Sequence, residues 1–397
     1  MKQFKVPVDL IMSKMVDDVE KGHSQAQKAS EVLLDRLETM IAQTPYEVVY
    51  QEDRVKLKHY KAKKNKEYKT PLLVVYALIN RETMLDLQPG RSVVERFLAH
   101  DIDLYMIDWG YPTRKDRFLG LDDHINGYMD NIVDFIRKKN KVKKVNLMGI
   151  CMGGTFCVIY SALHPEKVRN LITTVTPTNF ETEKGLLHSW MKHIDVDSVV
   201  NTYGNLSGDI MNFGFLLLNP ARLMIDKYVG FVEHMDKKIF VENFVRMEKW
   251  IFDSPDLPGE VFREFVTECY QKNKLIKSKL VVGGKHVDLK KITMPLLNIY
   301  GKYDHLVPPD ACNQLTKKVG SKDTEDICLD TGHIGIYVSS KCQETFAPKI
   351  AAWLKARDKT TKKAKTKSRI AGKTMEVQKK SLAIAAASDM KNKTRVL

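Results

Sequence analysis

The residue with the most distinctive potential chemistry is a cysteine in a glycine-rich stretch. VNLMGICMGGTFCVIYSALHPEKV, residues 145–168, begins as an apolar run and continues beyond Cys151 in a helical pattern. Gly149, Gly153 and Gly154 give the spacing of a turn that carries a nucleophile between a strand and a helix. Such a turn needs small residues because the helix packs close to the strand, and it lifts its central side chain above the sheet edge. The spacing therefore predicts that Cys151 is a nucleophile.

The electrostatics of this turn favour a negative charge on the cysteine. The amide of Met152 is expected to point at the position where an oxyanion forms, and the helix N-terminus that follows helps a thiol to ionise. The alternative is a buried structural cysteine in a tight turn. Cys157 lies farther along the predicted helix, where burial in the core is expected, and it is assigned no role.

Two further residues follow in the order nucleophile, acid, base. Asp304 comes directly after the apolar run LLNIYGK, and His333 lies in the glycine-flanked loop of CLDTGHIGIYV. An acid in this place holds the imidazole tautomer, and the imidazole accepts the thiol proton and later relays protons to and from hydroxyls. Each could be an ordinary loop residue by itself, but together with Cys151 they predict a catalytic triad. His305, beside the acid, is either an auxiliary residue or a structural histidine.

A second oxyanion donor is expected in the loop after the first core strand, YALINRETMLDLQPG. The backbone amides of Ile79 and Asn80 are the candidates, and either would act with the amide of Met152. Two such donors would stabilise the tetrahedral intermediate of an acyl transfer.

A thiol nucleophile suits one class of acyl transfer in particular. A thiolate attacks a thioester readily, and the resulting acyl-enzyme is itself a thioester, so the exchange is close to isoenergetic. The acyl group then passes downhill to an alcohol as an oxoester. A cysteine under an apolar cap therefore indicates transfer from a thioester donor to a hydroxyl acceptor, although hydrolases of the dienelactone type also carry a cysteine in this turn.

Apolar runs that alternate with helical patterns must position these residues. Several runs are apolar throughout, as parallel strands buried on both faces are, and the alternation is typical of βαβ units. The sequence predicts an α/β-hydrolase fold, a doubly wound and mostly parallel sheet with a helical cap insertion. The runs are LLVVYAL (72–78), DLYMIDW (103–109), VNLMGI (145–150), LITTVTP (171–177), LLNIYGK (296–302) and EDICLD (325–330).

The same patterns divide the chain into four parts. A strand pair is expected in EVVYQEDRVKLKHYKA, at the start of the hydrolase core. The aromatic-rich, helical segment between the fourth and fifth runs has the place of a cap that excludes water and shapes substrate entry. The predicted parts are N-terminal amphipathic helices (1–45), the core (46–178 and 293–355), the cap (179–292) and a basic, disordered tail (356–397).

Composition excludes several classes of protein. No apolar run of about 18 residues is present, so no membrane span is expected, and the N-terminus lacks the pattern of a signal peptide. The six cysteines are scattered among the 397 residues without a metal-type CxxC pair. This usage fits free thiols in a reducing cytosol, and no metal site is predicted.

The charge is concentrated at one end of the chain. Residues 355–397 carry 14 Lys and Arg against 3 Asp and Glu, a net +11 of the total +15. The body is nearly balanced, which leaves little support for specific nucleic-acid binding. The tail is either a solvated extension or a contact for an anionic surface or an acidic partner.

The motifs resemble those of one enzyme family over about residues 46–354. The stretches GICMGGTFCVIYSALHPEKVRNLITTVTP, YALINRETMLDLQP, YMIDWGYP, LDDHINGYMDN, RMEKWIFDSPD, NIYGKYDHLVPPDA and GHIGIYVS are similar to those of the catalytic C subunit of class III polyhydroxyalkanoate synthases. The resemblance departs from the family at Met152, where glutamine is frequent, and in the basic tail.

This resemblance implies a substrate, partners and a location. The substrate would be a (R)-3-hydroxyacyl-CoA, usually short-chain, such as 3-hydroxybutyryl-CoA. Cys151 would carry the growing polyester chain, His333 would activate Cys151 and the incoming hydroxyl, and Asp304 would support His333. An E-type subunit is the implied partner, in a homodimer or hetero-oligomer, and the enzyme would be cytoplasmic, on the surface of storage granules. The family needs no metal or redox cofactor.

The sequence is also compatible with other functions. A class IV synthase has a similar length, and a cysteine-dependent esterase or a polyester depolymerase would share the fold. Depolymerases usually carry serine, so the thiol weighs against them. A catalytically inactive scaffold is disfavoured because all three triad residues are present.

Overall fold

The computed structural model describes residues 41–62, 70–234 and 237–358. The chain divides into two compact units, Met1–Ala347 and Pro348–Leu397. The first unit holds the sheet and all the predicted site residues. The described part of the second unit consists of helix α15 (Phe346–Asp358), which begins just before the division.

An eight-stranded sheet forms the centre of the first unit, in the order β1-β2-β4-β3-β5-β6-β9-β10. The β1–β2 and β2–β4 pairs are antiparallel and the remaining pairs are parallel. This arrangement confirms the predicted fold class. The strands are β1 (Glu47–Glu52), β2 (Val55–Tyr60), β3 (Leu72–Val75), β4 (Leu104–Asp108), β5 (Val145–Ile150), β6 (Val168–Thr174), β9 (Leu296–Gly301) and β10 (Thr324–Leu329).

The central strands are apolar because the sheet is covered on both faces. Every residue of β3, β4 and β5 is buried, as expected for parallel strands between helices. All six predicted runs form strands. The fourth one is shifted, since β6 starts at Val168 and ends at Thr174, where the next residue, Val175, takes a left-handed backbone with φ 45°.

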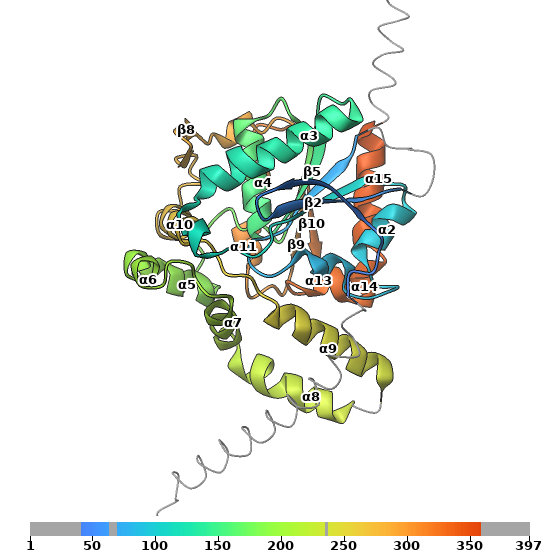
Figure 1. Cartoon of the computed structure of the whole chain (residues 1–397), viewed down its shortest axis with the longest axis vertical. Coiled ribbons are helices and arrows are strands. Elements are labelled where there is room, and N and C mark those ends of the chain that lie inside the picture. Colours follow the sequence, from blue (N-terminus) through green and yellow to red (C-terminus); the bar gives the residue numbers. More distant parts are fainter. Residues whose placement is uncertain (1–40, 63–69, 235–236, 359–397) are drawn as a thin grey trace, which may run out of the picture. The chain divides into compact units, whose positions relative to one another are not determined.

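Helices cover both faces of this sheet. In Figure 1, α3 and α4 lie on one side of the sheet and α2 on the other, and α4 packs on β3, β5 and β6. These helices and turns are η2 (Glu82–Asp86), α2 (Val93–Ala99), η3 (Arg114–Phe118), η4 (Asp123–Met129), α3 (Asp130–Asn140), α4 (Met152–Leu163), η7 (Leu289–Lys291), α11 (Pro309–Cys312), α12 (Leu315–Lys318), α13 (Gly335–Val338) and α14 (Ser340–Gln343).

A mostly helical insertion separates β6 from β9. Helix α9 packs on both α7 and α8, whereas α5 packs on η6 and α6 packs on α10 (Figure 1). The second group contacts the core through α10, which packs on η3, and the first group contacts it through α9, where Trp250 Nε1 donates to the carbonyl of Arg81. The elements are α5 (Leu186–His193), α6 (Val196–Tyr203), α7 (Gly208–Leu217), η5 (Ala221–Asp226), α8 (Lys227–Glu233), α9 (Lys238–Phe252), α10 (Gly259–Glu264), η6 (Phe265–Gln271), β7 (Val281–Val282) and β8 (Lys285–His286).

The two terminal predictions fall mainly outside the described residues. The N-terminal helices were expected over 1–45, and of this range the structure describes only 41–45, which are not helical. The basic tail was expected from residue 356, but α15 continues to Asp358. Lys355 and Arg357 in its last turn favour that continuation, since cations stabilise a helix C-terminus. None of the described helices is long and apolar enough to cross a membrane.

Candidate active site

Cys151 occupies the turn between β5 and α4 in a strained conformation. Its backbone has φ 52° and ψ −124°, a region that non-glycine residues adopt only when their surroundings enforce it. Hydrogen bonds at both the amide and the carbonyl of Cys151 hold this conformation. Its amide donates to the carbonyl of Thr174 on β6 (3.0 Å), and its carbonyl accepts from the amides of Gly154 and Thr155 (2.9 and 3.2 Å).

The glycines around the cysteine allow this close packing. A Cβ atom on Gly153 would overlap the carbonyl oxygens of Val75 and Tyr76, and one on Gly154 would overlap the side chain of Thr176. The start of α4 therefore lies directly against the end of β3 and the loop that follows it. Gly149 and Gly154 also approach each other too closely for a side chain on Gly149.

The loops that follow β9 and β10 bring Asp304 and His333 together. Asp304 Oδ2 lies 2.7 Å from His333 Nδ1. Its other oxygen, Oδ1, accepts the amides of Leu306 and Val307 at 2.9 and 2.8 Å. Because the Asp304 side chain is fully buried, these bonds hold one carboxylate oxygen in place and direct the other at the imidazole.

The second ring nitrogen of His333 faces the cysteine. Burial by itself lowers the pKa of His333, but the charges of Asp304 and Cys151, with a hydrogen bond to each, raise it to about 10. The His333 imidazole, between Asp304 and Cys151, is thus a stronger base than a free imidazole. Such an arrangement can take the proton of the Cys151 thiol and return it to a leaving group.

The predicted oxyanion donors lie at this same edge. Met152 is the first residue of α4, so its amide has no acceptor within the helix. Ile79 and Asn80 belong to the loop after β3, the strand that pairs with β5. Asn80 takes a left-handed backbone, with φ 60°. Its side chain turns to the insertion, where it donates to Ser254 Oγ.

His305 lies outside the hydrogen-bonded pair. Its side chain is exposed, and no described hydrogen bond joins it to the carboxylate of Asp304. Partial removal from water lowers the pKa of His305; Asp304 opposes this, while the positive charges of His333 and Arg222 add to it. Arg222 belongs to η5, so this histidine faces the insertion.

Sequence reasoning missed three tyrosines close to the cysteine. Burial, and then the charge of Cys151 among other groups, raises the pKa of Tyr76, Tyr270 and Tyr337. The Tyr337 hydroxyl also lies 2.9 Å from Thr174 Oγ1. Only Tyr337 carried a signal in the sequence, since it follows His333 by four residues. Tyr76 and Tyr270 are indistinguishable from core tyrosines by pattern.

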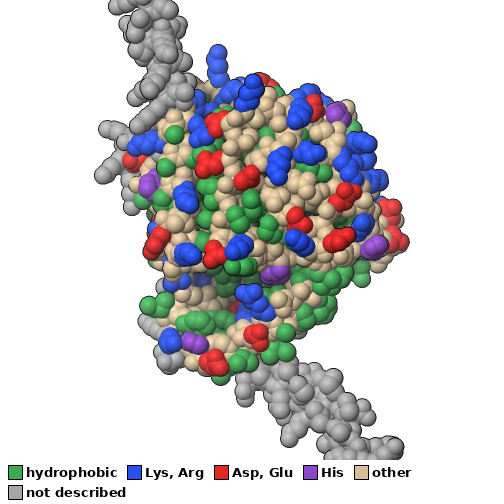
Figure 2. Space-filling view, turned by 180° about the vertical axis from the view of Figure 1, so that it is seen from behind, with side chains coloured by type: hydrophobic (Ala, Val, Ile, Leu, Met, Phe, Trp, Pro, Cys, Tyr) green, Lys and Arg blue, Asp and Glu red, His purple; other side chains and the backbone are tan. Residues whose placement is uncertain are grey.

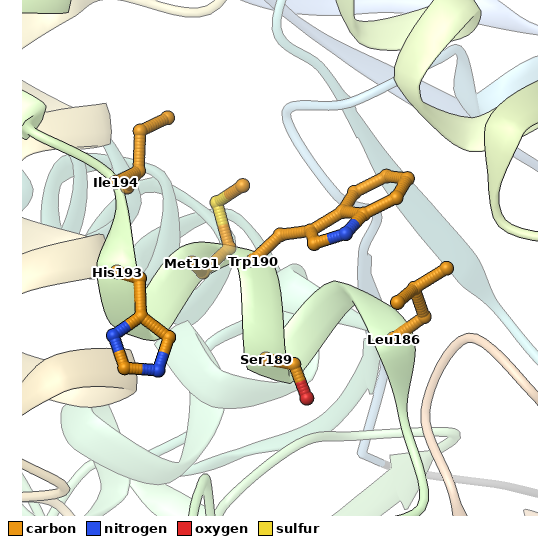
Figure 3. Close-up of a pocket in the computed structure, with 6 residues that line it drawn as sticks. All are labelled: Leu186, Ser189, Trp190, Met191, His193 and Ile194. Carbon is orange, nitrogen blue, oxygen red and sulfur yellow. The ribbon is translucent and has the colours of Figure 1, made fainter.

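A separate surface hollow is formed by α5 and the residue that follows it, and contains none of the predicted triad residues. Figure 3 shows its lining, which consists of Leu186, Ser189, Trp190, Met191, His193 and Ile194. Among the described residues, no group of three or more His, Cys, Asp and Glu could hold a metal ion. All six cysteines are unpaired.

Two protein-family models match the chain. One is described as the alpha/beta hydrolase fold and matches residues 70–339. The other, the N-terminus of poly-beta-hydroxybutyrate polymerase (PhaC), matches residues 10–97. The first match agrees with the sheet topology described above.

Individual proteins that resemble the chain belong to the same family or share the same fold. The chain is 46% identical over 353 residues to the poly(3-hydroxyalkanoate) polymerase subunit PhaC of Allochromatium vinosum, covering 88% of this chain and 99% of that one. The PhaC subunit of Thiocystis violacea is 45% identical over 354 residues, with the same coverage. Among solved structures, a soluble variant of monoglyceride lipase from Saccharomyces cerevisiae has a TM-score of 0.50 at 12% identity, covering 81% of this chain and 97% of that one; it shows the fold alone. This chain belongs to the PhaC subunits of poly(3-hydroxyalkanoate) polymerases, acyltransferases with an α/β-hydrolase fold.

Proposed function

We propose that this polymerase subunit uses Cys151, His333 and Asp304 to polymerise short-chain (R)-3-hydroxyacyl-CoA through a covalent cysteine thioester. The observation that supports this most directly is the arrangement of charged groups at the turn between β5 and α4. A strained cysteine at a helix N-terminus faces an imidazole whose other nitrogen is 2.7 Å from a fully buried carboxylate. This is the arrangement of a catalytic triad, in which a base contacts the nucleophile and an acid orients the base.

In the acylation step, His333 takes the proton of the Cys151 thiol. The thiolate attacks the carbonyl carbon of the acyl-CoA, and the resulting oxyanion accepts hydrogen bonds from the amide of Met152 and from an amide at Ile79 or Asn80. The bond between that carbon and the CoA sulfur then breaks. The departing sulfur receives the proton from His333, so CoA leaves as a thiol.

In the elongation step, His333 takes the proton of the 3-hydroxyl of the next hydroxyacyl-CoA. The hydroxyl oxygen attacks the Cys151 thioester, the carbon–sulfur bond breaks, and an ester bond forms. His333 returns its proton to the cysteine, and the lengthened acyl-CoA acylates Cys151 again. Asp304 keeps the imidazole tautomer that both steps need.

The surrounding parts have supporting roles in this proposal. Residues 46–178 and 293–355 form the core that carries the triad. The insertion between these two segments, residues 179–292, acts as a cap that excludes water from the thioester. The name "subunit" of the relatives indicates a multisubunit enzyme, and we infer an E-type partner and a place on the granule surface. The proposed chemistry needs no metal or redox cofactor. His305 has an auxiliary role at most, because it lies outside the Asp304–His333 pair.

A single assay tests the activity against hydrolysis. The protein, with and without its partner subunit, is given (R)-3-hydroxybutyryl-CoA while CoA release is followed with a thiol reagent. Polymerisation makes the solution turbid, whereas a thioesterase or depolymerase of the same fold releases soluble 3-hydroxybutyrate. CoA release with soluble acid as the main product would contradict the proposal.

A further inference from the structure

Three side chains form a junction between the loop after β3 and the insertion. Asn80 Nδ2 donates to Ser254 Oγ, and Ser254 Oγ lies 3.1 Å from Asn212 Oδ1 and 2.9 Å from the carbonyl of Ile251. Asn212 Nδ2 donates to that same carbonyl at 2.8 Å. We call Asn80, Asn212 and Ser254 the loop–insertion junction. Asn80 belongs to the loop after β3, Asn212 to α7, and Ser254 to the segment that directly follows α9.

The next residue of the loop is attached to both regions. The carbonyl of Arg81 accepts Trp250 Nε1 of α9 at 2.8 Å. The guanidinium of Arg81 reaches back into the core, where it lies 3.2 Å from Glu82 Oε2 and 3.2 Å from Asp108 Oδ1. The loop is therefore held between the core and the last turn of α9.

This attachment acts on the backbone next to Cys151. Asn80 has a left-handed backbone, a conformation that asparagine tolerates better than most residues. The amides of Ile79 and Asn80 take their directions from it. The same loop begins at Tyr76, whose carbonyl lies against Gly153, two residues after the cysteine.

We propose that Ser254 and Asn212 are positioning residues that hold the oxyanion-binding amide of this loop in place. The inference rests on the proposed function of Cys151 and deepens it. Through these residues the position of α9 sets the geometry of the oxyanion hole. Acylation therefore depends on where the insertion lies, although the insertion contributes no side chain to the triad.

The test separates the thiolate from the oxyanion hole. Iodoacetamide alkylates Cys151 by displacement at a saturated carbon, so this reaction needs the thiolate and His333 but develops no oxyanion. Acylation by (R)-3-hydroxybutyryl-CoA needs both. The two rates are measured on the full chain in single turnovers, in a Cys328→Ser background because Cys328 is exposed, with alkylation read at the Cys151 peptide by mass spectrometry.

Ser254→Ala removes the hydroxyl that links the loop to the insertion. We expect acylation to fall by about 10- to 100-fold, because a small misplacement of a catalytic group has effects of this size, while alkylation stays within about twofold. Ser189→Ala, which removes an exposed hydroxyl on α5 outside the junction, is the matched control and should change neither rate.

Asn80→Gly provides a second route to the same answer. Glycine keeps the left-handed backbone accessible but lacks the side chain that reaches Ser254, so it should reproduce the selective loss. If Ser254→Ala does not fold, this variant decides the question. The double variant should be no slower than the slower single variant, since both changes break one link.

Two results would overturn the inference. Acylation at the wild-type rate would show that the junction does not position the loop, and equal losses of acylation and alkylation would show a general structural role. Failure of the proposed function has a different signature, since wild-type protein would then be alkylated at Cys151 but would not release CoA.

Discussion

The sheet edge that carries Cys151 and the helical insertion beside it are packed in opposite ways. The helix behind the cysteine, α4, has all but its last residue buried. The insertion instead presents many large apolar side chains to solvent, and Figure 2 shows apolar side chains along its surface. These exposed residues are Leu186, Tyr203, Ile210, Phe213, Leu217, Ile225, Val229, Val232, Ile239, Phe240, Phe252 and Val281.

The difference in packing indicates different roles for the two regions. A strained residue keeps its geometry only where dense packing holds it, and the proposed triad lies on turns and loops at the edge of a buried sheet. The insertion surface is suited to binding another apolar surface, since large exposed apolar patches commonly mark interaction sites. The following predictions test this contrast, from the largest expected effect to the smallest.

The largest effect is expected from cysteine substitutions in the two regions. Cys151→Ala should abolish CoA release without unfolding the protein, because alanine fits the same turn. Cys151→Ser should retain little polymerisation, because the thioester step is lost. Cys157 of α4 and Cys269 of the insertion are fully buried, and alanine at either should leave turnover within a few-fold of wild type. A loss at Cys157 or Cys269 as complete as that at Cys151 would refute the assignment of the nucleophile.

Asp304→Asn tests the division of labour within the triad. The charge and hydrogen bond of Asp304 raise the pKa of His333, so the substitution should lower that pKa and weaken the base. Elongation, which must deprotonate an alcohol, should slow by about 100-fold or more, whereas acylation should slow by about 10-fold or less. Rapid-quench measurements of CoA release and of chain growth separate the two steps. Equal losses at both would contradict this account.

His333→Gln is the companion variant, and it should block acylation by CoA thioesters because activation of the thiol is lost. It therefore provides the limit against which the milder acylation defect of Asp304→Asn is judged.

A matched pair of phenylalanines tests the packing contrast itself. Phe156 on α4 is fully buried, whereas Phe213 on α7 is 57% exposed. Phe156→Ala should lower the free energy of unfolding by about 3–5 kcal/mol, and Phe213→Ala by about 0.5 kcal/mol or less. Urea denaturation of the isolated chain measures both. A large loss for Phe213→Ala would show that this surface is packed against something in the isolated chain.

Acid should destabilise the core through His124. This histidine is fully buried on η4, with Nδ1 2.8 Å from the Gly120 carbonyl and Nε2 3.2 Å from Arg54 Nη2. Burial lowers the pKa of His124 to about 4, with Gly120 opposing and Arg54 adding to the effect. Below pH 6.5 the unfolded chain binds a proton that the folded chain does not, so stability is lost as the pH falls from 6.5 to 4, by up to about 3 kcal/mol.

His124→Gln should remove this pH dependence even if it lowers stability by a constant amount. The insertion offers a comparison in His188, whose pKa burial also lowers to about 4, against the charges of Asp310 and Asp304. Unfolding curves between pH 4 and 7 for each glutamine variant give the two contributions. An unchanged slope in His124→Gln would contradict the first assignment.

The smallest effect on turnover is expected from the basic C-terminal segment. Truncation after Asp358 removes most of the charge carried by residues 355–397, and turnover on free acyl-CoA should stay within about twofold of wild type. Association with an acidic partner or an anionic granule coat should weaken and lose its salt dependence, because such attraction is screened beyond about 8–10 Å. A strongly reduced turnover of the truncated enzyme in low salt would instead favour docking of this segment on the body.

The proposed triad was accessible to sequence reasoning because its signals are local. Gly149, Gly153 and Gly154 are needed at a tight turn whichever residues surround it. The acid and base follow apolar runs, and the ends of parallel strands meet at one edge of a sheet. The strands themselves were recognisable because burial on both faces removes polar residues from them.

Only the tertiary structure revealed the loop–insertion junction and the tyrosines at the cysteine. Asn80 and Ser254 are 174 positions apart, and although each lies in a recognisable motif, nothing in the sequence indicates that their side chains meet. Tyr270 lies in η6 of the insertion, far along the chain from Cys151. The sequence by itself determined the tight turn at Cys151, the order of the proposed triad residues along the chain and the strands of the sheet, since these depend on local spacing and burial. The folded structure decided which insertion residues reach the site, because a hydrogen bond across the fold depends on helix packing that leaves no periodic trace in the chain.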